Sequence, residues 1–246
     1  MRGLSERTPA DFADILCGAE SPLIVGGQAV NLWAEVYTTA LPNLEAFAPF
    51  VSKDADIYGT RALAEQLASR TGWELHFDPR RESIVAAILR KQRNPAEPAL
   101  TIEVLSQVNG LSEADLALNS VVESREARTF RIPAPPVLLK AKLYNLASLV
   151  FTERPQDLKH ARMLCEIVPH YLTELQIDSR AGRLPESTFI GAVAYTGEVI
   201  TSGYAGNAAR PRSLELAGVI PPGIWFNAPA ALHPVLERLR FHGLAP

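Results

Sequence analysis

The sequence predicts an α+β fold, with a mixed, twisted sheet, flanking helices and a helical C-terminal region. Two observations lead to this prediction. Short β-rich segments alternate with helical patterns before Pro133, and beyond Pro133 the patterns are almost entirely helical. We therefore expect an α/β core over residues 1–132 and a mostly helical domain over residues 133–246, with a ligand cleft between them.

The composition is that of an ordinary globular protein. The chain has 246 residues, 47% of them hydrophobic, and a formal net charge of −3, which gives no overall attraction to nucleic acid. Cys17 and Cys165 have no metal-ligand or disulfide spacing, which is typical of a reducing bacterial cytoplasm. No signal peptide is evident, and no apolar run reaches the roughly 18 residues of a membrane span. We expect a cytoplasmic protein with no membrane partner.

The first half of the chain shows local signals for strands and helices in alternation. Thr60 and Gly72 are typical of the start and stop of a helix, and acidic residues follow Ser112 where a helix dipole favours them. The elements expected here are a helix over 9–18, a strand and then a helix around Gly26-Gly27, a loop over 38–49, a β-rich run over 50–59, a helix over 60–72, strands over 73–77, 83–91 and 99–108, and a helix from Ser112.

The second half begins after a predicted hairpin over residues 120–133, whose turn lies around Ser124 to Ala127. Two strong helical patterns follow, PPVLLKAKLYNLASLVF and RPQDLKHARMLCEIV. The remainder, from Pro169 on, is expected to be largely helical with breaks at Gly and Pro.

The most informative short motif is Asp54-Ala-Asp56. On a strand, side chains at i and i+2 point to the same face, so the two carboxylates would project together while Ala55 and Ile57 face the core. Paired carboxylates repel each other unless a cation lies between them, and hard oxygen ligands suit Mg²⁺ or Mn²⁺. The alternative is an Asp-x-Asp on a solvated strand edge or in a turn.

Two further features support the metal interpretation. Gly26-Gly27 opens a helix, where a close backbone approach and free N–H groups suit a phosphate, although a double glycine is equally often a plain turn. Glu103 lies within the apolar strand LTIEVL, so it either faces solvent or joins the acidic pair.

Together these features resemble the nucleotidyltransferase superfamily, whose signature is Gly-Gly or Gly-Ser, a helix, and a strand with two acids separated by one residue. Glu103 resembles the third acid of that family. The segments FRIPAPPVLLKAKLYNLA and ERPQDLKHARML resemble the abortive-infection-type subgroup, which includes bacterial toxins. Lys142, Arg154 and Asp157 match the lysine, arginine and aspartate of the subgroup pattern. The sequence departs from it by a longer gap between Gly27 and Asp54, by Gln156 in place of a lysine and by His160 in place of an aspartate.

The resemblance implies a nucleotidyltransferase-like fold and the transfer of a nucleoside monophosphate from an NTP to an acceptor. Asp54, Asp56 and Glu103 would be the catalytic, metal-binding residues, with Glu103 alternatively a general base. Residues implied to bind the nucleotide are Gly26, Gly27, Lys142, Arg154 and Asp157. The acceptor is RNA, a protein or a small molecule; a toxin acting on tRNA, with an antitoxin partner, is one version. The departures leave open a catalytically silent protein that binds a nucleotide or a partner.

Each of the basic and aromatic candidates also has a purely structural interpretation. Lys142 could lie on the solvated flank of an amphipathic helix, and Arg154 and Asp157, three residues apart, could simply pair with each other. We expect Lys140 and His160 at the surface. We expect Trp33, Trp73 and Trp225 in the core or at an interface.

Overall fold

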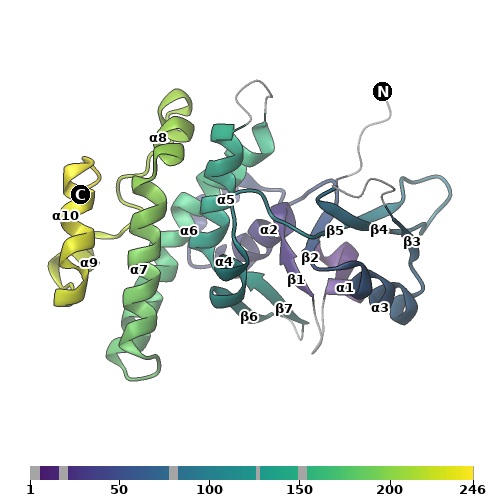
Figure 1. Cartoon of the computed structure of the whole chain (residues 1–246), viewed down its shortest axis with the longest axis horizontal. Coiled ribbons are helices and arrows are strands. Elements are labelled where there is room, and N and C mark those ends of the chain that lie inside the picture. Colours follow the sequence, from purple (N-terminus) through teal and green to yellow (C-terminus); the bar gives the residue numbers. More distant parts are fainter. Residues whose placement is uncertain (1–5, 17–21, 78–82, 126–127, 149–153, 246) are drawn as a thin grey trace.

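The computed structural model describes residues 6–16, 22–77, 83–125, 128–148 and 154–245. Within these ranges the chain is α+β, as the sequence predicts, with a seven-stranded mixed sheet and a largely helical second half (Figure 1). None of the described helices is both long and apolar enough to cross a membrane. Cys17 and the predicted hairpin turn at 126 and 127 lie outside the described residues.

The sheet has the strand order β3-β4-β5-β2-β1-β7-β6. Its centre is mixed, because β2 runs parallel to β5 but antiparallel to β1, and β1 runs parallel to β7. Two antiparallel pairs, β3 with β4 and β6 with β7, form its flanks. The strands are β1 (Leu23–Val25), β2 (Ala55–Tyr58), β3 (Glu74–His76), β4 (Val85–Lys91), β5 (Leu100–Leu105), β6 (Ser120–Arg125) and β7 (Arg128–Pro133).

Helices fill the connections of the first half and almost all of the second half. The α-helices are α1 (Ala13–Leu16), α2 (Gly26–Tyr37), α3 (Arg61–Thr71), α4 (Glu113–Leu118), α5 (Pro135–Ser148), α6 (Pro155–Arg180), α7 (Glu186–Thr201), α8 (Gly203–Ala209), α9 (Pro222–Phe226) and α10 (His233–Phe241). Short 3₁₀ helices are η1 (Pro9–Phe12), η2 (Pro42–Phe47), η3 (Arg210–Arg212) and η4 (Ala230–Leu232). In Figure 1, α7 to α10 extend away from the sheet on the side of α6.

The predicted helix ends are confirmed where the sequence carries a capping signal. The Thr60 side chain accepts a hydrogen bond from the Leu63 amide at the start of α3, and Gly72 ends that helix in the left-handed conformation. Ser112 and Asp115 form a reciprocal capping box at the start of α4. These ends depend on residues within one helical turn, which is why the sequence alone predicts them.

The prediction of a loop over residues 38–49 is wrong in part, because residues 42–47 form the 3₁₀ helix η2. Pro42 stands at the start of that helix, where its missing N–H removes no bond. Leu44 is fully buried and anchors the segment to the main core. Leu41 and Phe47 pack against the same core on either side of it, so apolar residues recur every three positions, a period that is short and flanked by prolines in the sequence.

The predicted break at Pro169 is also wrong, because α6 continues through this proline to Arg180. Proline removes one backbone donor from a helix interior, which usually bends or breaks it. Here Ile167, Val168 and Leu172, on both sides of the proline, are fully buried in the main core. Tertiary packing therefore holds the helix together across a residue that disfavours it.

The two faces of the sheet have different surroundings, and this difference positions the candidate site. Ile24, Ile57 and Ile102 belong to the main hydrophobic core, on the side that α2 covers. Their neighbours Leu23 and Val25 pack with Leu116 of α4 in a second, smaller cluster. Because side chains alternate along a strand, every second residue of β2 and β5 points toward this second face.

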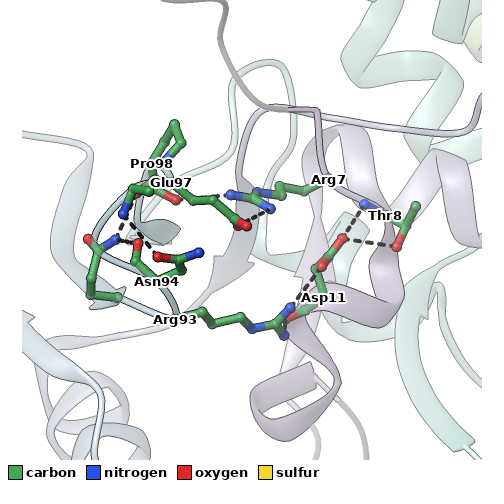
Figure 2. A network of polar contacts seen from close by, with 9 residues as sticks. Arg7, Thr8, Asp11, Arg93, Asn94, Glu97 and Pro98 are labelled. Carbon is green, nitrogen blue, oxygen red and sulfur yellow. Dashed lines mark hydrogen bonds and ion pairs between the residues drawn. The ribbon is translucent and has the colours of Figure 1, made fainter.

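A polar network ties the N-terminal segment to the connection between β4 and β5 (Figure 2). The Arg7 guanidinium donates to the Pro98 carbonyl at 2.9 Å and lies 3.7 Å from the Glu97 carboxylate. Arg93 forms an ion pair with Asp11 at 2.9 Å. The segment before α1 is therefore fastened to the connection between β4 and β5.

Candidate active site

Asp56 and Glu103 lie side by side on the second face of the sheet. They are direct partners in the parallel register of β2 and β5, and Asp56 also stands opposite Val25 of β1. Neighbouring strands are about 4.8 Å apart, so the two carboxylates share one patch of the face. The core residues on either side, Ala55, Ile57, Ile102 and Val104, are fully buried on the other face. The structure thus brings together two of the three acids that the sequence singled out.

Asp54 does not lie on the strand, and in this respect the sequence-based expectation is wrong. β2 begins at Ala55, and Lys53 and Asp54 form a bend just before it. The alternation that relates residues i and i+2 on a strand therefore does not apply to Asp54 and Asp56. The Asp54 carboxylate still lies near the other two acids, and its charge raises the pKa of both Asp56 and Glu103.

The three acids crowd negative charge into a partly desolvated place. Burial, together with the carboxylates of Asp54 and Glu103, raises the pKa of Asp56 to about 7. Burial and Asp54 also raise the pKa of Glu103. Both shifts have the direction expected for like charges that lack a compensating cation. An electropositive group between them would restore ordinary ionisation.

Gly26 and Gly27 bring the backbone into close contact with side chains of the site. Gly26 has φ of +66°, and a Cβ atom there would lie 1.9 Å from Oδ2 of Asp56. A Cβ atom on Gly27 would lie 2.8 Å from Oγ of Ser52 and 3.0 Å from Cε1 of His160. α2 starts at these glycines without a side-chain cap, so its first N–H groups have no partner within the helix. The turn packs directly against the Asp56 carboxylate.

Lys142, Asp157 and Arg154 form one ion-pair network. Nζ of Lys142 donates to Oδ1 of Asp157 at 2.7 Å, and Arg154 donates to Oδ2 at 3.0 Å. Lys142 is only 6% exposed, so it does not lie on a solvated helix flank. Burial raises the pKa of Asp157, but Lys142 and Arg154 outweigh that effect and hold it below the ordinary value. The local pairing of Arg154 with Asp157 is confirmed, and Lys142 extends it from α5 to α6.

A cavity of about 950 Å³ joins the acids, the glycine turn and this network. Asp56 and Glu103 line it from the sheet, Gly26 from the turn, and Lys142, Arg154 and Asp157 from α5 and the start of α6. Asp54 and Gly27 are not part of the lining. The helical half of the chain therefore forms one wall of the cavity, as the fold prediction expected.

The opposite lip of the cavity consists of residues 106–113, from the end of β5 to the start of α4, and none of them was among the predicted site residues. Asn109 donates a hydrogen bond to Asn145 of α5 at 2.8 Å, joining this lip to the helical wall. Gly110 has φ of +78° and packs against the Tyr144 ring. The Asn109-Gly110 pair after a strand marks a turn, but only the tertiary structure places that turn at the cavity.

Two residues expected at the surface take part in internal contacts instead. His160 is fully buried, and burial and Lys142 lower its pKa to about 3, so the ring is neutral. Lys140 forms an ion pair with Asp115 at 2.9 Å. Both lie on helices whose polar positions are covered by other elements, which helical periodicity does not reveal. Trp33 and Trp73 are buried, as expected, and Trp225 packs partly buried against the main core.

The acids suit a divalent cation in chemical type, although they are not gathered into a closed site. All three are oxygen donors, and their mutual repulsion is what a cation would relieve. No group of three or more His, Cys, Asp or Glu side chains in the described part of the chain could hold a metal ion together. Mg²⁺ commonly takes only one or two protein carboxylates and completes its coordination with substrate phosphates and water. The Asp56–Glu103 pair meets that requirement.

No known protein family and no curated protein matches this chain, so the geometry of the site carries the functional argument.

Proposed function

We propose that this protein is a metal-dependent nucleotidyltransferase, which transfers a nucleoside monophosphate from an NTP to an acceptor. The observation that carries the proposal is the pair Asp56 and Glu103 in one cavity with Gly26 and the Lys142–Asp157–Arg154 network. Oxygen ligands, an uncapped helix start and two cations are the groups that a triphosphate and its metal require.

Each group has a distinct task in this proposal. Asp56 and Glu103 would hold Mg²⁺ or Mn²⁺, and Asp54 in the adjacent bend would add its negative charge to the attraction for the cation. The metal would neutralise phosphate charge and favour ionisation of the attacking hydroxyl. The N–H groups at the start of α2 would receive phosphate oxygens. Because Gly26 has no side chain, the Asp56 carboxylate can lie directly against the same turn.

Lys142 and Arg154 would bind the phosphates from the opposite wall. Asp157 holds both cations in place, and the three side chains together keep one net positive charge. Arg154 is the more accessible of the two, with 37% of its side chain exposed against 8% for Lys142. A guanidinium can form two parallel bonds to a phosphate, whereas an ammonium acts as a point charge. Arg154 is therefore expected to make the directional contact.

A label-transfer experiment tests the proposal. The protein is incubated with each α-³²P-labelled NTP, with Mg²⁺ or Mn²⁺, and with cell extract later divided into RNA, protein and small-molecule fractions. Asp56→Asn and Glu103→Gln keep the side-chain shape and remove the charge, so each should abolish transfer. Asp178→Asn changes a partly exposed carboxylate on α6, outside the cavity lining, and serves as the matched control.

The three outcomes have different meanings. Label in one fraction, absent with Asp56→Asn and retained with Asp178→Asn, would support the proposal and name the acceptor class, including tRNA for a toxin. Metal-dependent NTP binding without transfer would favour a catalytically silent nucleotide-binding protein. A protein that neither binds an NTP nor transfers label would contradict the proposal.

A further inference from the structure

The segment Pro49–Ser52, which we call the entry segment, leads directly into the bend at Asp54 and the strand that carries Asp56. α6 holds this segment from one side. Nε2 of Gln156 donates to the Val51 carbonyl at 3.0 Å, and Nζ of Lys159 donates to the Pro49 carbonyl at 2.9 Å. Both donors come from the first two turns of α6, the same turns that supply Asp157 to the cavity.

The N-terminal segment holds the entry segment from the other side. Arg7 and Ser52 exchange two backbone hydrogen bonds, each 2.8 Å long. The Arg7 carbonyl also accepts from Nε2 of Gln28, the residue after the glycine turn, at 3.0 Å. The Arg7 side chain is itself fixed to Pro98 and Glu97, as Figure 2 shows. Arg7 thus connects the entry segment, the glycine turn and the connection between β4 and β5.

The buried His160 ring lies next to both Gln156 and Gly27. Its Nε2 atom is 2.9 Å from Nε2 of Gln156, and its ring is neutral, so the glutamine amide can donate to it. Gly27 lies close to the His160 ring and the Ser52 hydroxyl, so a side chain there would require one of them to shift. The entry segment, the glycine turn and α6 therefore pack as one unit, and the Gln156 side chain contacts both His160 and the entry segment.

From these contacts we propose that Gln156 is a positioning residue, which holds the entry segment so that Asp54 and Asp56 stay in register with the Gly26-Gly27 turn. The inference rests on the proposed function and assigns a role to one of the departures from the family pattern. Gln156 itself is exposed and does not line the cavity. It acts through the entry segment, in the way that residues behind metal ligands commonly orient them.

The test compares three variants. Gln156→Ala removes the donor, Gln156→Lys restores a donor to the Val51 carbonyl, and Gln66→Ala removes an exposed glutamine from α3 as the matched control. The measurements are the dissociation constant for Mn²⁺ alone by electron paramagnetic resonance, kcat and NTP KM at saturating metal, and the urea midpoint of unfolding. Amide hydrogen exchange of residues 49–56 in the metal-free protein gives a readout independent of activity.

Removal of such a supporting contact commonly weakens metal binding by about 10-fold or more. We therefore expect Gln156→Ala to weaken Mn²⁺ binding by about that factor, to lower kcat with little change in NTP KM, and to speed exchange in residues 49–56. Gln156→Lys should restore all three properties. Gln66→Ala should match the wild type, whereas Gln156→Ala should have a somewhat lower urea midpoint, because the buried His160 ring and the Val51 carbonyl lose a hydrogen-bond donor.

Wild-type Mn²⁺ affinity in Gln156→Ala would overturn the inference while leaving the proposed function standing. A loss of Mn²⁺ affinity that Gln156→Lys does not restore, or unchanged exchange of residues 49–56 in Gln156→Ala, would also overturn it. A wild-type protein that neither binds Mn²⁺ nor transfers label would contradict the proposed function and this inference together.

Discussion

Gly26 shows how a single missing side chain shapes the candidate site. Its backbone is in the left-handed region, with φ of +66°, and the space that a Cβ atom would fill is occupied by the Asp56 carboxylate. Left-handed backbone disfavours other residues because their Cβ atom approaches the backbone. Two independent reasons therefore require glycine at this position, and the second of them concerns the site itself.

We expect Gly26→Ala to lower stability by more than the left-handed backbone alone explains, because the added Cβ atom would displace the Asp56 carboxylate. We also expect label transfer to fall by about 100-fold, the effect of a displacement of about 1 Å at a catalytic group. Gly182→Ala is the control, because Gly182 has φ of +71° and a Cβ atom there would meet no atom within 4 Å apart from its immediate neighbours in the chain. It should cost only about 1–2 kcal/mol and leave transfer unchanged. Urea unfolding measures the stability loss and label transfer measures the activity loss. Equal losses of stability in Gly26→Ala and Gly182→Ala would contradict the expectation.

At the scale of elements, Asp115 joins three helices. It caps the start of α4 through Ser112, accepts a hydrogen bond from the Tyr195 hydroxyl of α7 at 2.6 Å, and pairs with Lys140 of α5. Burial raises its pKa, but the hydrogen bonds from Tyr195, Ser112 and Lys140 together lower it to about 2. One carboxylate thus fastens the lip of the cavity to the helical wall.

This arrangement predicts a pH-dependent contribution to stability. Because the pKa of Asp115 is lower in the folded state than its ordinary value of 3.8, the contribution is fully present above about pH 4 and is lost as the pH falls toward 2. Asp115→Asn should therefore lower the free energy of unfolding by about 1.5–3 kcal/mol at pH 7, the usual worth of hydrogen bonds to a charged group.

Urea unfolding measured from pH 7 downward checks this prediction. The difference in the free energy of unfolding between Asp115→Asn and the wild type should narrow below about pH 4. The control is Glu113→Gln, which changes an exposed carboxylate in the same first turn of α4. A gap that stays constant as the pH falls would show that Asp115 contributes through its shape and not through its charge.

At the scale of the whole molecule, one hydrophobic core runs through both halves of the chain. Its buried members range from Phe12 near the N-terminus to Leu239 in α10. α2, which follows the glycine turn, packs on β1 and β2 and also on α5 and α6. Trp33 of α2 donates a hydrogen bond to the Pro133 carbonyl at 2.9 Å and lies edge-on to Tyr171 of α6, with ring centroids 5.7 Å apart.

This continuity predicts that a fragment of residues 1–132 will not fold by itself. The fragment would expose the face of α2 that α5 and α6 cover, including Trp33, and apolar burial is the main stabilising contribution in a domain. We expect a collapsed or aggregated species with weak near-ultraviolet circular dichroism. The full chain should show one cooperative transition in urea, and a well-dispersed amide spectrum from the fragment would contradict the prediction.

The sequence by itself determined the features that depend on neighbouring residues. The caps at Thr60 and Ser112, the left-handed stop at Gly72 and the alternation of residues 100–105 act within a few residues, so the pattern reveals them. The same is true of the glycine turn that opens α2, and these elements suffice for the α+β class.

Only the tertiary structure decided which of these elements meet. Asp56 and Glu103 stand together because β2 and β5, separated by three other elements in the chain, pair in parallel. Lys142 and His160 are buried because α5 and α6 pack together and against α2, and α6 passes through Pro169 because its apolar residues on both sides enter the core. Each of these three features depends on packing between segments far apart in the chain. Caps, turns and periodicity, in contrast, reflect only local preferences.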